Sequence, residues 1–399
     1  MTEVTNADAS RLFKVPLAFL LIASMLGLLL RSQQIWPLPA VVYSHLLHAH
    51  SHVMFLGWIF NVLLIAFSLE FAEVKMFRAL FWVLQSLVLG MLVSFPLQGY
   101  GVFSIVFSSL HTIGTFAFII LFLRATRGKS SFSLMLAKAA LVFFVLSSFG
   151  PFALGYLKSN APEHSNIYRF AIYFYLHFQY NGFFFFGILS LIARLAEIYL
   201  PSKDLRRLQY ACHAFIIACL PAFLLSTLWS KPSLIFNIIG MLSAITQLAG
   251  LLLIWAPMKK LINQKDISGN ARLFFALSSV ALIIKFGLQF ISAFPAAAEF
   301  ANEFRHVVIA YLHLVLVGFT SFFLFGWLIH KKVIPATVHW ETRLIAGSFI
   351  ISEFLLAVSP WSENANTTTV ELLRLVFLLS CLMVAGLLGT VVKAYRTNS

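Results

Sequence analysis

Four histidines stand close together at positions 45, 48, 50 and 52, at the start of a long apolar run. On an α-helix, His45, His48 and His52 share one face because they are three and seven residues apart, whereas His50 points to the other side. Imidazole nitrogens bind iron, copper and zinc, and an ionisable side chain in a membrane helix indicates function. The shared face could therefore hold a metal or a haem. For His45 and His48, hydrogen bonding to water at the lipid headgroups is an equal alternative; for the deeper His52, a ligand role is favoured.

A short pattern follows His52 and recurs twice. Each of His52, His177 and His313 is followed by a glycine five residues later. The intervals between the three histidines correspond to four membrane spans each, which indicates an internal repeat. A glycine one and a half turns below the histidine lets a flat ring or a neighbouring helix approach the backbone.

The composition is that of an integral membrane protein. Of 399 residues, 60% are hydrophobic and 11% are charged, which excludes a water-soluble globule. Apolar runs of about 20 residues are long enough to cross the hydrocarbon, and only helices satisfy their own backbone there. We therefore predict an all-α membrane protein. Its twelve spans are expected at residues 13–30, 45–69, 78–97, 103–123, 132–157, 166–193, 205–229, 232–256, 271–294, 304–330, 341–360 and 369–392.

The connecting loops are short, so residues 1–399 are predicted to form a single twelve-helix transmembrane domain. Three pseudo-repeats of four helices are expected at about 1–125, 126–256 and 257–399. The net charge of +14 is scattered between the spans, which argues against nucleic-acid binding. Most of the Lys and Arg residues fall on the side that holds the N-terminus and the even-numbered loops. By the positive-inside rule both termini are cytoplasmic, and the protein belongs in a bacterial inner membrane.

Cofactor chemistry is limited by the cysteines and carboxylates. The three cysteines all lie in predicted spans, and no Cys-x-x-Cys-His sequence is present, so any haem is non-covalent. A b-type haem, with copper as a further candidate, is the cofactor we expect. The depths of His52, His111, His177 and His313, about 10–16 Å from the outer ends of their spans, place them in one layer. For His111 alone a structural hydrogen bond is favoured over ligation. No Asp or Glu lies near this layer, which argues against a carboxylate-bridged di-iron site and against hard cations.

Two charges are expected within spans. Lys285, with Gln289 one turn on, and Glu353 both lie mid-span, where an unpaired charge is expensive. A buried ion pair between them is the favoured interpretation. The alternative is a proton path, with polar company on the sixth span from Tyr173, Tyr175, Gln179, Tyr180 and Asn181.

These features together resemble a known superfamily. Twelve spans, cytoplasmic termini, three pseudo-repeats and histidines on spans two, six and ten are similar to the catalytic subunit (subunit I) of haem-copper oxidases. More closely, the segment from His50 through His52 to Trp58 resembles the His-x-His-x4-Gly segment of NnrS-type proteins, and His313 with Gly318 resembles their later His-x4-Gly segment. NnrS-type proteins contain haem and copper and protect against nitric oxide. The resemblance implies that His50, His52 and His313 are metal or haem ligands, with His177 added by the repeat.

The chain also departs from these families. His177 lacks the oxidase His-Pro-Glu-Val-Tyr sequence, and His306 is separated from His313 by six residues where the oxidases have His-x-His. The Gly-His-Thr-Gly-Arg type of segment found in NnrS-type chains is missing. The copper ligands of an oxidase are therefore not recognisable.

The resulting hypothesis is a haem-binding inner-membrane protein with a redox or nitric-oxide-handling role. His52 and His313 would be axial haem ligands, and a second haem or a copper ion would be bound among His48, His50, His111 and His177. Its partners would be membrane lipid, a small gas such as NO or O2, and an electron donor. One alternative is an oxidoreductase, the catalytic subunit of a divergent oxidase or nitric oxide reductase. The others are a secondary transporter and a scaffold subunit without cofactor.

Overall fold

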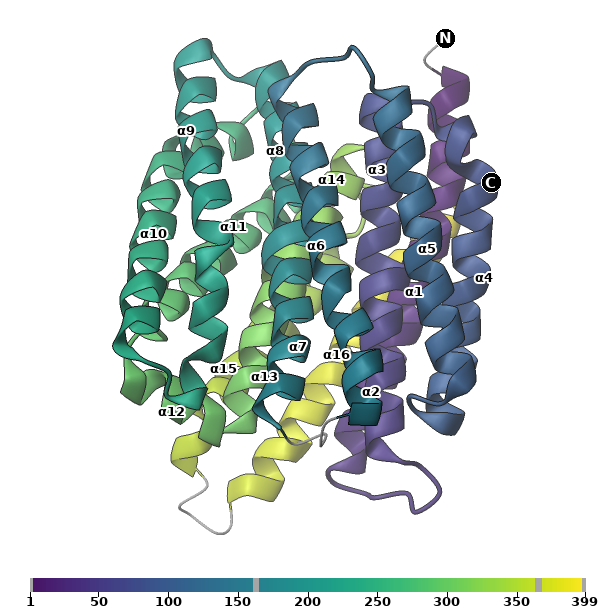
Figure 1. Cartoon of the computed structure of the whole chain (residues 1–399). Helices are drawn as coiled ribbons and strands as arrows, with labels where there is room; N and C mark the ends of the chain where they lie inside the picture. Colours follow the sequence, from purple (N-terminus) through teal and green to yellow (C-terminus); the bar gives the residue numbers. More distant parts are fainter. Residues whose placement is uncertain (1–2, 161–164, 363–367, 397–399) are drawn as a thin grey trace. The chain divides into compact units, whose positions relative to one another are not determined.

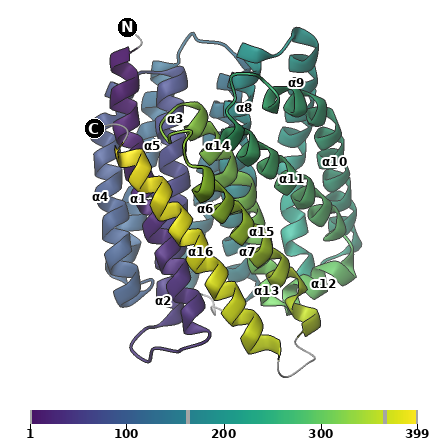
Figure 2. The ribbon, with the colours of Figure 1, turned by 180° about the vertical axis from the view of Figure 1, so that it is seen from behind.

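The computed structural model describes residues 3–160, 165–362 and 368–396 (Figures 1 and 2). Within these ranges all regular structure is helical. The elements are α1 (Glu3–Gln33), α2 (Tyr43–His52), η1 (Val53–Phe60), α3 (Asn61–Phe71), α4 (Val74–Gln98), α5 (Val102–Ala125), α6 (Phe132–Asn160), α7 (Asn166–Leu176), η2 (His177–Phe184), α8 (Phe185–Tyr199), α9 (Ser202–Cys219), η3 (Pro221–Ser230), α10 (Leu234–Ile262), α11 (Gly269–Ile291), α12 (Pro295–Glu303), α13 (Arg305–His313), η4 (Leu314–Ser321), α14 (Phe322–His330), α15 (His339–Ser362) and α16 (Thr368–Arg396).

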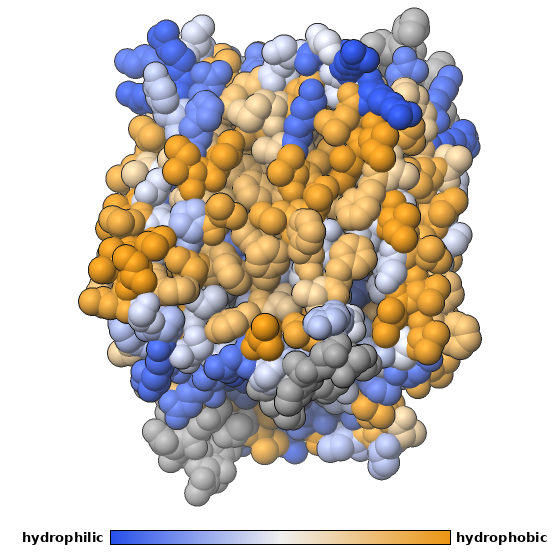
Figure 3. All heavy atoms as spheres, in the orientation of Figure 1, coloured by the Kyte–Doolittle hydropathy of each residue, from blue (hydrophilic) through white to orange (hydrophobic). Residues whose placement is uncertain are grey.

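The prediction of a multi-pass helical membrane protein is confirmed. In the described ranges, 11 helices are long and apolar enough to cross a membrane, and a twelfth is obtained if the bent pair α9 and η3 is one span. On the face drawn in Figure 3, apolar side chains cover the middle of the helices, and hydrophilic side chains gather near the helix ends. This distribution suits a hydrocarbon slab bounded by two aqueous layers.

The helices form two compact units. Unit 1 consists of Met1–Lys129, Ser268–Ala271 and Leu324–Ser399, and unit 2 of Ser130–Ile267 and Arg272–Phe323. In unit 1, α1 packs against α2, η1 and α16, and α4 packs against α2 and α5. In unit 2, α6 packs against α7, η2 and α8, and α10 packs against α9 and η3 (Figure 1). Each unit is described by itself below.

All three His-x4-Gly segments adopt a π-helix, which the sequence did not predict. The π segments are η1, η2 and η4, and each is eight residues long. His177 is the first residue of η2, and His52 and His313 immediately precede η1 and η4. A π-helix bonds each N–H to the carbonyl five residues earlier; it is rare and is frequent at functional sites. The repeated sequence thus has a common backbone conformation.

The hydroxyls of η4 follow the same wide spacing. Thr320 donates its hydroxyl proton to the carbonyl of Val315 at 2.8 Å, and Ser321 donates to that of Leu316 at 2.8 Å. In an ordinary α-helix these hydroxyls reach carbonyls three or four residues back. The side chains therefore reinforce the π geometry here.

Two glycines of the pattern, Gly57 and Gly182, allow a neighbouring helix to pack closely against the backbone. A Cβ on Gly57 would lie 2.9 Å from the Cβ of Phe19 on α1, and a Cβ on Gly182 would lie 2.7 Å from that of Phe143 on α6. Real Cβ atoms do not approach this closely, so any side chain would push the helices apart. Of the two predicted reasons for these glycines, the approach of a neighbouring helix accounts for both positions.

The predicted seventh span corresponds to two helical segments instead of one continuous helix. The axes of α9 and η3 differ by 42°. Pro221 has no N–H to donate and begins a tighter 3-10 segment, in which Phe223 donates to the carbonyl of Leu220. The carbonyls at the end of α9 therefore lose their usual partners and need others.

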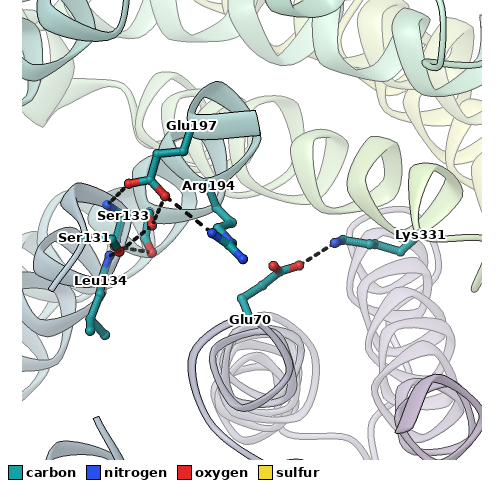
Figure 4. Close-up of polar contacts among 8 residues, drawn as sticks. Glu70, Ser131, Ser133, Leu134, Arg194, Glu197 and Lys331 are labelled. Atoms are coloured by element: carbon teal, nitrogen blue, oxygen red, sulfur yellow. Dashed lines mark hydrogen bonds and ion pairs between the residues drawn. The ribbon is translucent and has the colours of Figure 1, made fainter. Parts of the chain in front are cut away.

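Charged side chains tie helix ends together within each unit (Figure 4). In unit 1, Lys331 lies 2.5 Å from the carboxylate of Glu70. In unit 2, the carboxylate of Glu197 accepts hydrogen bonds from the backbone N–H of Ser133 at 2.8 Å and from its hydroxyl at 2.7 Å, and lies 3.6 Å from Arg194. A carboxylate at the start of α6 satisfies an unbonded N–H and interacts favourably with the helix dipole.

Candidate functional site

His52 of unit 1 is held in the orientation that metal-binding histidines use. Its Nδ1 lies 2.9 Å from the backbone carbonyl of His48. Because a carbonyl only accepts, the ring proton is on Nδ1, and the lone pair is on Nε2. Nε2 has no hydrogen bond to the described part of the chain. Histidine ligands of metals usually donate the other ring N–H to a carbonyl or carboxylate, which fixes the tautomer. The ring packs on Phe95, 4.2 Å away between centroids.

His111 of α5 is fully buried, and neither of its ring nitrogens has a hydrogen-bond partner among the described residues. Its ring makes an edge contact with Phe60, 5.1 Å between centroids. His52 and His111 are close enough to interact electrostatically. A buried polar group without a partner costs about 1–3 kcal/mol of stability, and a ligand bound to the ring of His111 would relieve part of that cost. The sequence favoured a structural hydrogen bond for this residue, and no such bond is present within the described ranges.

The other histidines of α2 divide between its two faces as predicted. The ring of His48 packs on Tyr100, 4.5 Å between centroids, and His52 approaches the same ring at 5.9 Å. The ring of His45 lies against Gly99, where an added Cβ would be 2.5 Å from its Cδ2. Gly99 also has φ of +58°, which L side chains rarely adopt. The shared face of α2 therefore packs against the end of α4 and the turn that follows it.

His50 points the other way, toward α1. Its Nδ1 donates to the carbonyl of Ala23 at 2.8 Å, and its ring fills the space beside Gly27. His50 thus has a packing role between α1 and α2, separate from the face that carries His52.

In unit 2, both ring nitrogens of His177 are hydrogen-bonded to protein groups. Nε2 lies 2.9 Å from the carbonyl of Cys219, and Nδ1 lies 3.2 Å from the side-chain amide nitrogen of Asn181. The consistent assignment is Nε2–H donating to the carbonyl and Nδ1 accepting from the amide. Cys219 is the last residue of α9, so His177 satisfies a carbonyl that the helix break leaves without its usual partner. For His177 to act as a ligand, one of these bonds would have to be exchanged.

His313 ends α13 in unit 2 and is half-buried. The predicted pairing of His52 with His313 as axial ligands joins two units, and it stays a prediction. The single layer of four histidines stays one for the same reason.

Lys285 and Glu353 each have a partner in their own unit. Lys285, which is 1% exposed, donates to the side-chain carbonyl of Gln289 at 2.7 Å and lies 4.1 Å from the ring centre of Phe286. Glu353 lies 3.9 Å from Arg31. The predicted ion pair between Lys285 and Glu353, like the proton path, joins residues of different units and stays a prediction.

Unit 1 offers two imidazoles, those of His52 and His111, as candidate metal ligands. No three His, Cys, Asp or Glu side chains of the described chain are grouped as metal ligands, and structural zinc prefers four. Two imidazoles would suit haem iron or a copper ion. Two small hollows, one in each unit, have volumes of about 10 Å³ each and are lined by no histidine. A porphyrin would need a ring-sized hollow beside the two imidazoles, whereas a bare ion would not.

In comparisons with known proteins, no family model and no curated protein matches the chain. The resemblance to NnrS-type proteins and to haem-copper oxidases therefore depends on the motifs and the topology given above.

Proposed function

We propose that the protein is a redox protein of the membrane that holds a metal, as haem iron or as copper, with His52 and His111 as ligands. The observation that carries this proposal is His111, which is fully buried with neither ring nitrogen bonded in the described part of the chain and lies within electrostatic range of His52. Inside a membrane no bulk water satisfies such a group, so a metal bound through its lone pair is the partner that the pair is suited to.

The chain's own groups prepare the site. The carbonyl of His48 holds the proton of His52 on Nδ1 and leaves Nε2 to ligate. Phe60 and Phe95 pack against the two rings and keep water away. When bound, a copper ion would supply one-electron chemistry and a binding position for a small gas such as NO or O2, whereas haem iron held by both imidazoles would supply electron transfer. An apolar gas partitions into lipid, so a site within the spans is accessible to it.

The proposal includes the three-repeat organisation and the nitric-oxide-handling role implied by the resemblance. The shared π conformation of η1, η2 and η4 supports the repeat. An electron donor, an inner-membrane location and cytoplasmic termini complete the proposal.

Metal content of the purified protein tests this function. We expect wild-type protein in detergent to contain iron or copper near one equivalent, with a Soret absorption band if the metal is haem iron. His52→Ala should lose most of this metal because it removes one of two ligands. His50→Ala is the matched control, since His50 bonds the carbonyl of Ala23 on the other face of α2. Wild-type protein without either metal, or equal metal in His52→Ala, would contradict the proposal.

A second candidate function, secondary transport, is favoured by the break between α9 and η3 in unit 2. Broken helices form many transporter sites. At this break, Cys219 lies close enough to Lys285 for the two side chains to interact electrostatically. A buried ammonium suits an anionic substrate. We would then expect proteoliposomes to take up nitrite or acetate, with uptake lost in Lys285→Met and kept in Lys138→Met, which alters another lysine within a span. Equal uptake by empty liposomes would rule this function out.

A further inference from the structure

The histidine face of α2 continues from a helix end to the proposed metal site. His45 lies in the first turn of α2, after a loop in which Trp36 and Val42 are exposed. His48 and His52 follow along the face and both pack on Tyr100. His45, His48 and His52 are half-buried, whereas His111 is fully buried. The four imidazoles thus run from a solvent-accessible loop to the interior of unit 1.

Neighbouring rings in this series are close to one another. His48 interacts electrostatically with His45, His52 with His48, and His111 with His52. Phe95 contacts the rings of both His48 and His52, at 6.1 and 4.2 Å between centroids. His48 and His52 therefore lie against the same two aromatic side chains, Phe95 and Tyr100.

The ring nitrogens of the series are largely uncommitted. Neither ring nitrogen of His45 or His48 is hydrogen-bonded to a described residue, and His52 uses only Nδ1. Each ring therefore offers a lone pair, and a ligand held by one imidazole has a further imidazole next to it. The series contains no carboxylate.

The donor set selects the ion. Hard cations such as Ca²⁺ and Mg²⁺ require oxygen ligands, and zinc prefers four ligands, whereas no group of three ligating side chains exists in the described ranges. Copper(I) is soft, accepts two nitrogen ligands, and carries a single charge, which lowers the penalty for leaving water. Coordination by one or two imidazoles at a time suits a series of histidines along one helix face.

We propose that His45 and His48 form an entry path along which copper(I) passes to His52 and His111. This inference rests on the function proposed above. Each transfer is a ligand exchange, in which a bond from copper to the next imidazole forms as the bond to the previous one breaks. The copper stays monovalent, and no proton or electron moves.

Loading kinetics of metal-free protein test the path. Copper(I) is supplied under anaerobic conditions from a chromogenic chelator, and the loss of chelator absorbance gives the rate. We expect the double variant His45→Ala, His48→Ala to load about tenfold or more slowly than wild type, as for a barrier raised by about 1.4 kcal/mol or more, and to reach the same final stoichiometry. His50→Ala, on the opposite face, should load at the wild-type rate, and His52→Ala should not retain copper.

A rescue separates a metal path from a packing defect. His48→Met keeps a soft ligand at this position and should restore much of the wild-type rate, whereas His48→Leu has a similar volume and should not. Wild-type loading rates in the double variant, or equal rates in His48→Met and His48→Leu, would overturn the path. Protein that holds haem iron but takes up no copper would overturn the path and leave the proposed function standing, whereas protein that holds neither metal would remove both.

Discussion

Replacing His111 with leucine is expected to abolish metal retention and, at the same time, to stabilise the metal-free protein. Metal is lost because one of two proposed ligands is removed. Stability rises because a fully buried imidazole whose nitrogens are unbonded in the described structure is replaced by an apolar side chain beside Phe60. Relief of an unsatisfied polar group contributes about 1–3 kcal/mol in soluble proteins, and the lower end applies in membranes.

The two effects are measured separately. Iron and copper are quantified in purified His111→Leu protein, and unfolding of the metal-free protein is followed by circular dichroism as SDS is added to mixed micelles. We expect a midpoint at higher SDS than for metal-free wild type. A lower midpoint would mean that His111 has a structural hydrogen bond, and unchanged metal content would remove it from the site. A loss of binding together with a gain in stability is typical of functional sites, where a side chain that is unfavourable for folding is retained because it binds a ligand.

The spans were predictable from the sequence because their length and apolar character are set by the membrane itself. The expected span at 45–69, for example, corresponds to the continuous helical run Tyr43–Phe71. The π segments and the break at Pro221 were not predicted. In a π-helix the backbone N–H bonds the carbonyl five residues earlier instead of four, and a uniformly apolar sequence contains no pattern that indicates this change. A proline alone does not predict a break, because Pro96 lies inside α4 and the helix continues past it.

The histidine site was predictable in part. The spacing of His45, His48 and His52 was sufficient to place their rings on one face and His50 on the other, because helical periodicity determines direction. Whether the ring nitrogens of His111 have hydrogen-bond partners depends on the groups that other helices place around it. The sequence near His111 does not contain this information. The only available signal was its predicted depth, which matched that of His52.

His177 illustrates the opposite case, and its replacement with leucine is expected to destabilise the protein. The variant would leave the carbonyl of Cys219 without its 2.9 Å bond from Nε2 and the amide of Asn181 without its acceptor, both within the membrane. Two unsatisfied buried groups cost about 1–3 kcal/mol each in soluble proteins, and less where the membrane-embedded unfolded state finds other partners. We expect the SDS midpoint to fall, while metal bound at His52 and His111 is retained.

His177→Gln provides the matched comparison, since its amide can still donate to the carbonyl of Cys219 and should recover part of the lost stability. A His177→Leu protein that unfolds at the wild-type midpoint would contradict the role of this ring at the helix break. Loss of metal from His177→Leu with unchanged stability would instead make His177 a ligand, as its place in the repeat first indicated. Two fully buried histidines of similar sequence context thus give leucine variants with shifts of opposite sign, because the protein hydrogen-bonds one ring at both nitrogens and the other at neither within the described structure.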